Sequence, residues 1–137
     1  MTINVREKGA VGEREMCKWL DRHLGIEAER NLEQVRSGGA DIITGHFVFE
    51  VKRVEKLDVQ LAWVQCVVAT RKINAVDRDI DLFREPVLAF RKNKRSWRFA
   101  ISARHIGLQK GYLAMSEMTF KDWAEGVMRG ESTNACI

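Results

Sequence analysis

The sequence has almost no proline and no low-complexity run. Its 137 residues include a single proline, and no stretch has the Pro-rich or Gly/Ser-rich composition of a linker between domains. Hydrophobic residues make up 45% and charged residues 31% of the chain, which is typical of a globular domain that buries a core. We therefore expect one domain over residues 1–137, with a frayed tail over residues 131–137.

Long apolar runs and paired cysteines are missing too. No stretch has the length of uninterrupted apolar sequence that a transmembrane helix needs, and the polar N-terminus lacks the hydrophobic region of a signal peptide. The three cysteines, Cys17, Cys66 and Cys136, are odd in number and widely spaced, which suits neither a disulfide framework nor a zinc site. We expect a protein of the reducing cytoplasm with no membrane partner.

Signatures of several enzyme classes are absent as well. The chain has no GxGxxG motif, no P-loop and no nucleophile elbow, which argues against a small-molecule α/β enzyme. The formal net charge of +4 and the pI of about 9.1 mildly favour a polyanionic partner without identifying one.

Hydrophobic periodicity predicts an α/β sandwich with a small mixed sheet. Helices are expected over residues 5–24, ended by Gly25, over residues 57–72, and from an N-cap at Thr119 to Gly130. Strands are expected over residues 26–31, in a hairpin between residues 37 and 53, and over residues 86–90, 96–102 and 112–118. Residues 74–84 are expected to form a loop or short helix, and residues 91–95 a basic turn.

The hairpin carries an aspartate on its first strand and Glu-Val-Lys on its second. Alternation along the second strand points Glu50 and Lys52 to the same face, and the hairpin returns Asp41 beside them. Two converging carboxylates are costly unless a cation lies between them, and oxygen ligands with open water positions suit Mg²⁺. We therefore interpret the three residues as a candidate active site; the alternative is a solvated strand face.

Glu13 is a further candidate. It precedes Met16 by three residues on the first helix, so it is expected on or beside the buried face, whereas Glu15 and Lys18 are expected in water. From that position Glu13 can supply a third carboxylate to the same metal. The alternative is an ordinary exposed helix glutamate.

Several segments share a pattern with one nuclease family. They are KGAVGERE at residues 8–15, RSGGAD at residues 36–41, EVK at residues 50–52, PVLA at residues 86–89 and WRF at residues 97–99. Together they resemble the archaeal-type Holliday junction resolvases of the PD-(D/E)XK nuclease superfamily, and RNLEQ at residues 30–34 resembles phage-encoded members. The resemblance implies a restriction-endonuclease-like core, with a mixed central β-sheet flanked by helices.

The resemblance also implies a metal site and a mechanism. Glu13, Asp41 and Glu50 would bind Mg²⁺, with Mn²⁺ as a substitute, and Lys52 would handle the attacking water. Nucleases of this superfamily often place a Gln or Lys on the following helix to support the site. Gln65 is the choice here, with Gln60 as the competing one.

The DNA contacts implied by the resemblance are basic residues near the site. Arg14 would contact phosphate, and either Arg30 or Arg36 would take the place of the phosphate-binding arginine; Arg30 is favoured because it ends an expected strand. Lys8 completes the set.

The function implied is metal-dependent hydrolysis of phosphodiester bonds at branched DNA, as in the resolution of a four-way junction. Paired cuts on two strands suit a symmetric homodimer, and a phage-encoded protein would act in the bacterial cytoplasm. One alternative is a nuclease of the same fold with another specificity, such as a nickase, a repair nuclease or one that degrades host DNA. The other is a non-catalytic DNA-binding module.

Overall fold

A five-stranded mixed sheet forms the centre of the molecule. The computed structural model of the chain describes residues 5–32, 39–76 and 83–130, with side chains from Gly9 onward. The elements are α1 (Val5–Leu24), β1 (Ile42–Ile43), β2 (Phe47–Arg53), α2 (Val59–Val76), β3 (Glu85–Arg91), β4 (Arg98–Ser102), the 3₁₀ helix η1 (Ala103–Ile106), β5 (Tyr112–Ser116) and α3 (Glu117–Met128). The strands lie in the order β1-β2-β3-β4-β5. Strands β2 and β3 are parallel and joined through α2, and the other neighbours are antiparallel.

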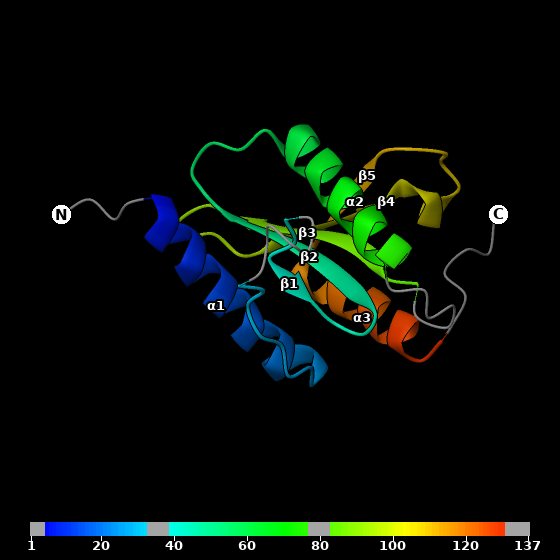
Figure 1. Cartoon of the computed structure of the whole chain (residues 1–137), viewed down its shortest axis with the longest axis horizontal. Coiled ribbons are helices and arrows are strands. Elements are labelled where there is room, and N and C mark those ends of the chain that lie inside the picture. Colours follow the sequence, from blue (N-terminus) through cyan, green and yellow to red (C-terminus); the bar gives the residue numbers. More distant parts are fainter. Residues whose placement is uncertain (1–4, 33–38, 77–82, 131–137) are drawn as a thin grey trace.

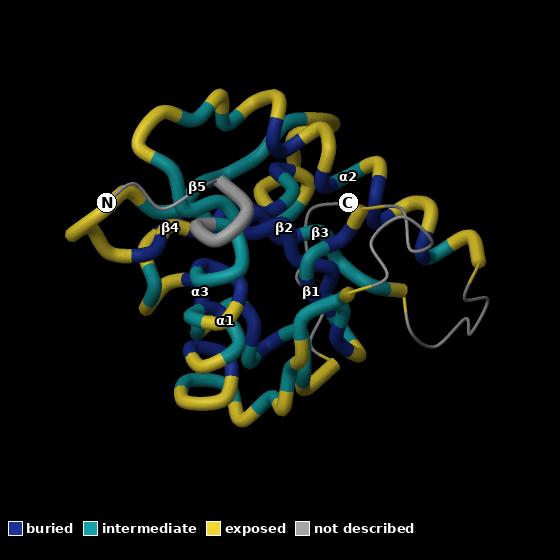
Figure 2. Tube along the Cα trace, turned by 60° about the vertical axis from the view of Figure 1, so that its left-hand side comes forward, coloured by how far each residue is buried: buried dark blue, intermediate teal, exposed yellow. Residues whose placement is uncertain are grey.

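The helices cover both faces of the sheet, α1 and α3 on one and α2 on the other (Figure 1). The alternation predicted for β2 is present: Phe47, Phe49 and Val51 belong to the core under α1 and α3, whereas Val48 packs with residues of α2. Most residues of β2 and the middle residues of β3 are buried (Figure 2). The α/β class with a mixed central sheet flanked by helices is therefore confirmed.

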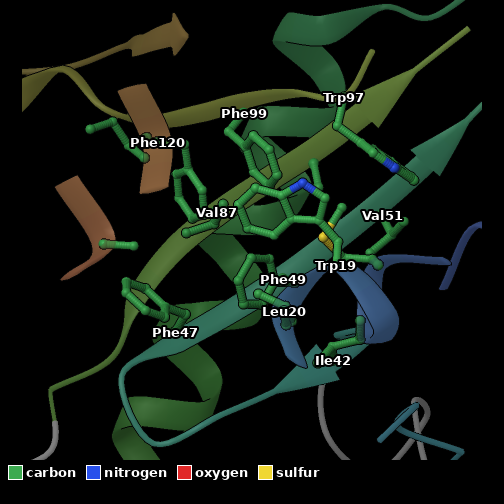
Figure 3. Close-up of a cluster of buried hydrophobic side chains, with 14 of the residues drawn as sticks. Trp19, Leu20, Ile42, Phe47, Phe49, Val51, Val87, Trp97, Phe99 and Phe120 are labelled. Carbon is green, nitrogen blue, oxygen red and sulfur yellow. The ribbon is translucent and has the colours of Figure 1, made fainter. Parts of the chain in front are cut away.

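Aromatic side chains fill the core between the sheet and the pair α1 and α3 (Figure 3). The rings of Phe99 and Phe120 are stacked, with centroids 4.0 Å apart, and Trp19 lies 4.8 Å from Phe99. The indole nitrogen of Trp19 donates a 2.7 Å hydrogen bond to Glu117 of α3. Buried aromatic rings contribute large apolar areas, so this cluster holds the first helix and the last helix against one face.

Three sequence expectations about local structure were wrong. Residues 26–31 form no strand; the only pairing there is an isolated bridge between Arg30 and Ile42. Helix α2 spans 59–76 rather than 57–72, although Asp58 does accept a hydrogen bond from the amide of Leu61, as an N-cap does. Helix α3 is capped by Ser116 and not by Thr119, since the Ser116 side chain accepts from the Thr119 amide.

None of the helices in the described part of the chain is long and apolar enough to cross a membrane. The expected frayed tail at residues 131–137 lies outside the described residues.

Candidate active site

A short hairpin places Asp41 against the second half of β2. The turn is closed by Thr44, whose amide donates to the carbonyl of Phe47 at 2.9 Å. One residue before β1, the amide of Asp41 donates to the carbonyl of Phe49 at 3.0 Å. The Oδ2 atom of Asp41 accepts a 2.7 Å hydrogen bond from the amide of Val51. These bonds fix both the backbone and the carboxylate of Asp41 beside β2.

Glu50 and Lys52 project from the face of β2 that α2 covers. Their side chains form an ion pair, with 3.4 Å between Glu50 Oε1 and Lys52 Nζ. Glu50 is only 8% exposed, whereas the Lys52 side chain is one-third exposed. The structure thus brings together Asp41, Glu50 and Lys52, the three residues that alternation along the hairpin predicted to meet.

The two carboxylates of the hairpin are electrostatically disfavoured where they stand. Burial raises the pKa of Asp41 to about 7, and the nearby charge of Glu50 contributes to the same rise, against the opposing hydrogen bond from Val51. Burial also raises the pKa of Glu50; Lys52 opposes that rise and Glu13 adds to it. Neighbouring carboxyl groups with raised pKa values are typical of a site that binds a cation, because the cation offsets the repulsion between the two ionised groups.

Glu13 approaches the site from α1 and is paired with an arginine. It is 7% exposed, and its charge raises the pKa of both Asp41 and Glu50. Arg30 Nε lies 3.6 Å from Glu13 Oε1, which is an ion pair rather than a hydrogen bond. That nitrogen is buried and has no hydrogen-bond partner among the described residues. Arg30 is therefore positioned at the site with hydrogen-bonding capacity left over.

The donor set suits a hard divalent cation, although the three predicted ligands are not assembled around one point. Among the residues that the structure describes, no group of three His, Cys, Asp or Glu side chains converges closely enough to hold a metal. What is assembled is the pair Asp41 and Glu50, with Glu13 within electrostatic range. Mg²⁺ is commonly bound by one or two carboxylates together with water and substrate phosphates, and this pair fits that pattern.

The remaining predicted residues with described side chains lie on α1 and α2. Arg14 is exposed on α1. Gln65 is exposed and shares the flank of α2 with Ala62 and Ala69 by helical spacing; Ala69 packs with Val48 of β2. Gln60 lines a groove on the other flank.

Two of the predicted basic residues are not among the side chains that the structure describes. Arg36 lies outside the described residues, and Lys8 lies in α1 with a side chain that is not described. Of the two candidates for the phosphate-binding arginine, Arg30 is therefore the one whose side chain is described.

Glu15 keeps 30% of its side chain exposed, as its expected place on the wet side of α1 implies, but it is ion-paired rather than simply solvated. Glu15 Oε1 lies 3.2 Å from Arg53 Nε, and Glu15 Oε2 lies 3.2 Å from Arg91 Nη1. The two arginines are register partners at the ends of the parallel strands β2 and β3. Glu15 therefore ties α1 to the strand ends next to Lys52. The signal available in the sequence was an arginine directly after Glu-Val-Lys, which needs a partner when its strand is central.

The comparisons with known proteins identify one family. Neither the search of curated proteins nor the search of solved structures gave a match. A family model described as "Phage putative PDDEXK endonuclease" matches residues 4–129. The mixed sheet with flanking helices is consistent with the restriction-endonuclease-like fold of PD-(D/E)XK proteins, and nucleases of this class generally use divalent metals. Because the match spans nearly the whole chain, including every element that builds the site, this protein belongs to the phage PDDEXK endonuclease family.

Proposed function

We propose that this chain is a metal-dependent endonuclease that cuts branched DNA, with Mg²⁺ as its cofactor and Mn²⁺ as a substitute. The observation that carries the proposal is the convergence of Asp41 and Glu50, both with raised pKa, on Lys52. Endonuclease family membership implies a DNA substrate. The preference for a four-way junction, and action as a homodimer in the bacterial host cytoplasm, rest on the resemblance of the sequence motifs to junction resolvases.

Asp41 and Glu50 would hold the metal, with Glu13 as a third ligand when its pairing with Arg30 is released. When bound, a divalent cation lowers the pKa of a coordinated water and stabilises negative charge on the scissile phosphate. Lys52, an ammonium beside the carboxylates, orients the attacking water or the developing charge. Gln65, at the rim of α2, supports this arrangement from the solvent side.

Arg30 is the residue best suited to the scissile phosphate. Its buried Nε has no hydrogen-bond partner among the described residues, and a guanidinium matches the geometry of phosphate oxygens. A phosphate that engages Arg30 competes with Glu13 for the same positive charge. Arg14, Arg36 and Lys8 would contact the backbone further from the cut, where contacts add affinity and little sequence information.

Cleavage of a synthetic four-way junction and of a matched linear duplex tests the proposal. The purified chain is incubated with each substrate in Mg²⁺ or EDTA, beside Asp41→Asn. A matched control is Asp58→Asn, which removes the same charge from the N-cap of α2, a position where Asn is also favoured.

Symmetric nicks on the junction alone, lost in EDTA and in Asp41→Asn but kept in Asp58→Asn, are the expected result. Cleavage of both substrates would keep the site and replace junction resolution by a less selective nuclease activity. Binding of the junction without any cleavage would point to a non-catalytic DNA-binding module instead.

A further inference from the structure

A basic turn between β3 and β4 stands at the same end of the sheet as the candidate site (Figure 1). The segment from Arg91 to Arg95 reads Arg-Lys-Asn-Lys-Arg, and Arg98 begins the next strand. From sequence alone such a turn is most simply a solvated hairpin tip. In the structure, the position, the fixed backbone and the charge of the turn favour a contact with a polyanion.

The register of the sheet connects the site to β4. Lys52 of β2 pairs with Phe90 of β3, and Phe90 pairs with Arg98 of β4. Paired residues share a face of the sheet, so Lys52 and Arg98 point to the same face as Glu50. Two strand spacings separate their Cα atoms by roughly 10 Å. Arg98 is exposed, so this face of the sheet carries one cationic side chain on either side of Phe90, Lys52 in the site and Arg98 beside the turn.

The turn is held in place. The amide of Asn93 donates a 2.9 Å hydrogen bond to Oε1 of Glu55, in the loop between β2 and α2. Within the turn, the amide of Arg95 donates to the carbonyl of Lys92 at 3.2 Å, and Lys94 adopts the left-handed conformation with φ of 61°. At its base, Arg91 is bound by Glu15 and lies over the ring of Trp97. The turn is thus fixed relative to the loop that follows Lys52.

The positive charge of the turn is not neutralised within the described part of the chain. Lys92, Lys94 and Arg95 are exposed, and no described carboxylate forms an ion pair with any of them. Glu55, the nearest acid with a defined contact, accepts from a backbone amide of the turn. A cluster of cations on a fixed backbone, beside a site for phosphodiesters, is complementary to a polyanion.

We infer that the β3–β4 turn, through Lys92, Lys94 and Arg95, is a docking surface for the DNA backbone flanking the cut. This inference rests on the proposed function for the identity of its partner. One strand of duplex DNA carries a phosphate about every 3.4 Å along the axis, so the ~10 Å between Lys52 and Arg98 corresponds to about three phosphates. Arg98 therefore lies a few nucleotides from the phosphate at the metal site, and the turn that ends three residues before Arg98 contacts the backbone on the same side of the cut.

The test measures DNA binding in EDTA as a function of salt. The turn variant is Lys92→Gln/Lys94→Asn/Arg95→Gln, in which Asn tolerates the left-handed conformation at position 94. The control variant, Arg71→Gln/Lys72→Gln/Lys110→Gln, removes the same charge from exposed residues away from the turn. The probe is a labelled linear duplex, both variants are checked for folding by urea unfolding, and cleavage in Mg²⁺ is assayed separately on the parent chain.

Loss of three phosphate contacts should reduce the slope of log K against log salt concentration by about 2.7, at about 0.9 per contact. The control should keep the parental slope. An equal reduction in both variants would mean that only net charge matters, and an unchanged slope in the turn variant would mean a solvated tip; either result overturns the inference.

The cleavage assay separates this inference from the proposed function. A parent chain that cleaves DNA while the turn variant keeps its slope would overturn the docking surface alone. If the parent chain cleaves no DNA but the turn variant has a smaller salt slope than the parent, the nuclease function is overturned and the docking surface stands. A parent chain that binds no DNA overturns the docking surface.

Discussion

The amide of Val51 donates a 2.7 Å hydrogen bond to Oδ2 of Asp41. This bond joins the residue before β1 to the segment of β2 between Glu50 and Lys52, so the hairpin itself sets the position of the carboxylate. The contact is made by Oδ2 of the carboxylate. A hydrogen bond from a backbone amide favours the ionised form, yet burial and Glu50 outweigh it and raise the pKa of Asp41 to about 7.

The stability of the metal-free protein should fall as the pH rises from about 4 to about 7. The pKa of Asp41 is 3.8 in the reference state and about 7 in the folded chain, so in this window the folded state keeps a proton that the unfolded chain has released. The linkage relation then gives a free energy of unfolding that decreases with pH. Glu50 adds a shift of the same direction.

Urea unfolding in EDTA at several pH values measures this effect, with Asp41→Asn as the comparison. The variant should have a flatter pH dependence and should be more stable than the parent above pH 7, because Asn carries no charge and can still accept from Val51. Parallel pH profiles for the two proteins would contradict the assignment of the shift to Asp41.

Replacing Lys52 by Gln should slow cleavage by about 10²–10³-fold, the usual effect of losing one group that stabilises developing charge. DNA affinity should change little, since one partly buried ammonium adds at most one phosphate contact. Single-turnover cleavage and equilibrium binding separate the two effects. Lys56→Gln, in the exposed loop after β2, is the matched control, and an equal loss of cleavage rate there would remove Lys52 from the site.

Replacing Arg30 by Gln should weaken DNA binding and reduce the salt slope by about 0.9, as expected for one phosphate contact. The control Arg22→Gln removes the same charge from an exposed position in the last turn of α1. Binding isotherms over a range of salt concentrations measure both. If Arg30→Gln and Arg22→Gln have the same slope as the parent, Arg36 becomes the candidate for the phosphate-binding arginine.

Replacing Glu15 by Ala should destabilise the protein by about 1–3 kcal/mol, because two arginines at the strand ends lose their partner. Glu15→Gln keeps hydrogen-bonding capacity and should cost less. Urea unfolding of both variants at neutral pH gives the difference. Equal and negligible losses would mean that Glu15 is only a surface charge.

The central hairpin could be predicted from the sequence because its strands and turn are determined by residues that are close together in the chain. Alternation of Phe47, Phe49 and Val51 with Glu50 and Lys52 follows from strand geometry, and a turn of fixed length returns Asp41 to the same place. The boundaries of α1 were equally local, since Gly25 takes the left-handed conformation that ends the helix. Patterns of this kind need no knowledge of distant contacts.

The sequence expectations differed from the structure where a side chain's environment depends on residues distant in sequence, or where two residues compete for the same role. Glu15 is satisfied by Arg53 and Arg91, which come from two separate strands, and helix periodicity carries no information about them. Ser116 and Thr119 are both residue types that favour the N-cap position. The N-cap of α3 is Ser116, the residue at which β5 ends. The pairing of Arg30 with Glu13 depends on the path of residues 26–31, where the sequence suggested a strand.

Metal binding by the 137-residue chain in the absence of DNA decides whether Asp41 and Glu50 hold a divalent cation. Mn²⁺ binding, followed by calorimetry or by the loss of its free electron paramagnetic resonance signal, is compared among the parent, Asp41→Asn, Glu50→Gln and the control Asp58→Asn. We expect the parent and the control to bind Mn²⁺, with weaker binding below pH 7, where protons compete for Asp41. The other two variants should lose binding. Undiminished binding by Asp41→Asn and Glu50→Gln would mean that neither carboxylate holds the metal.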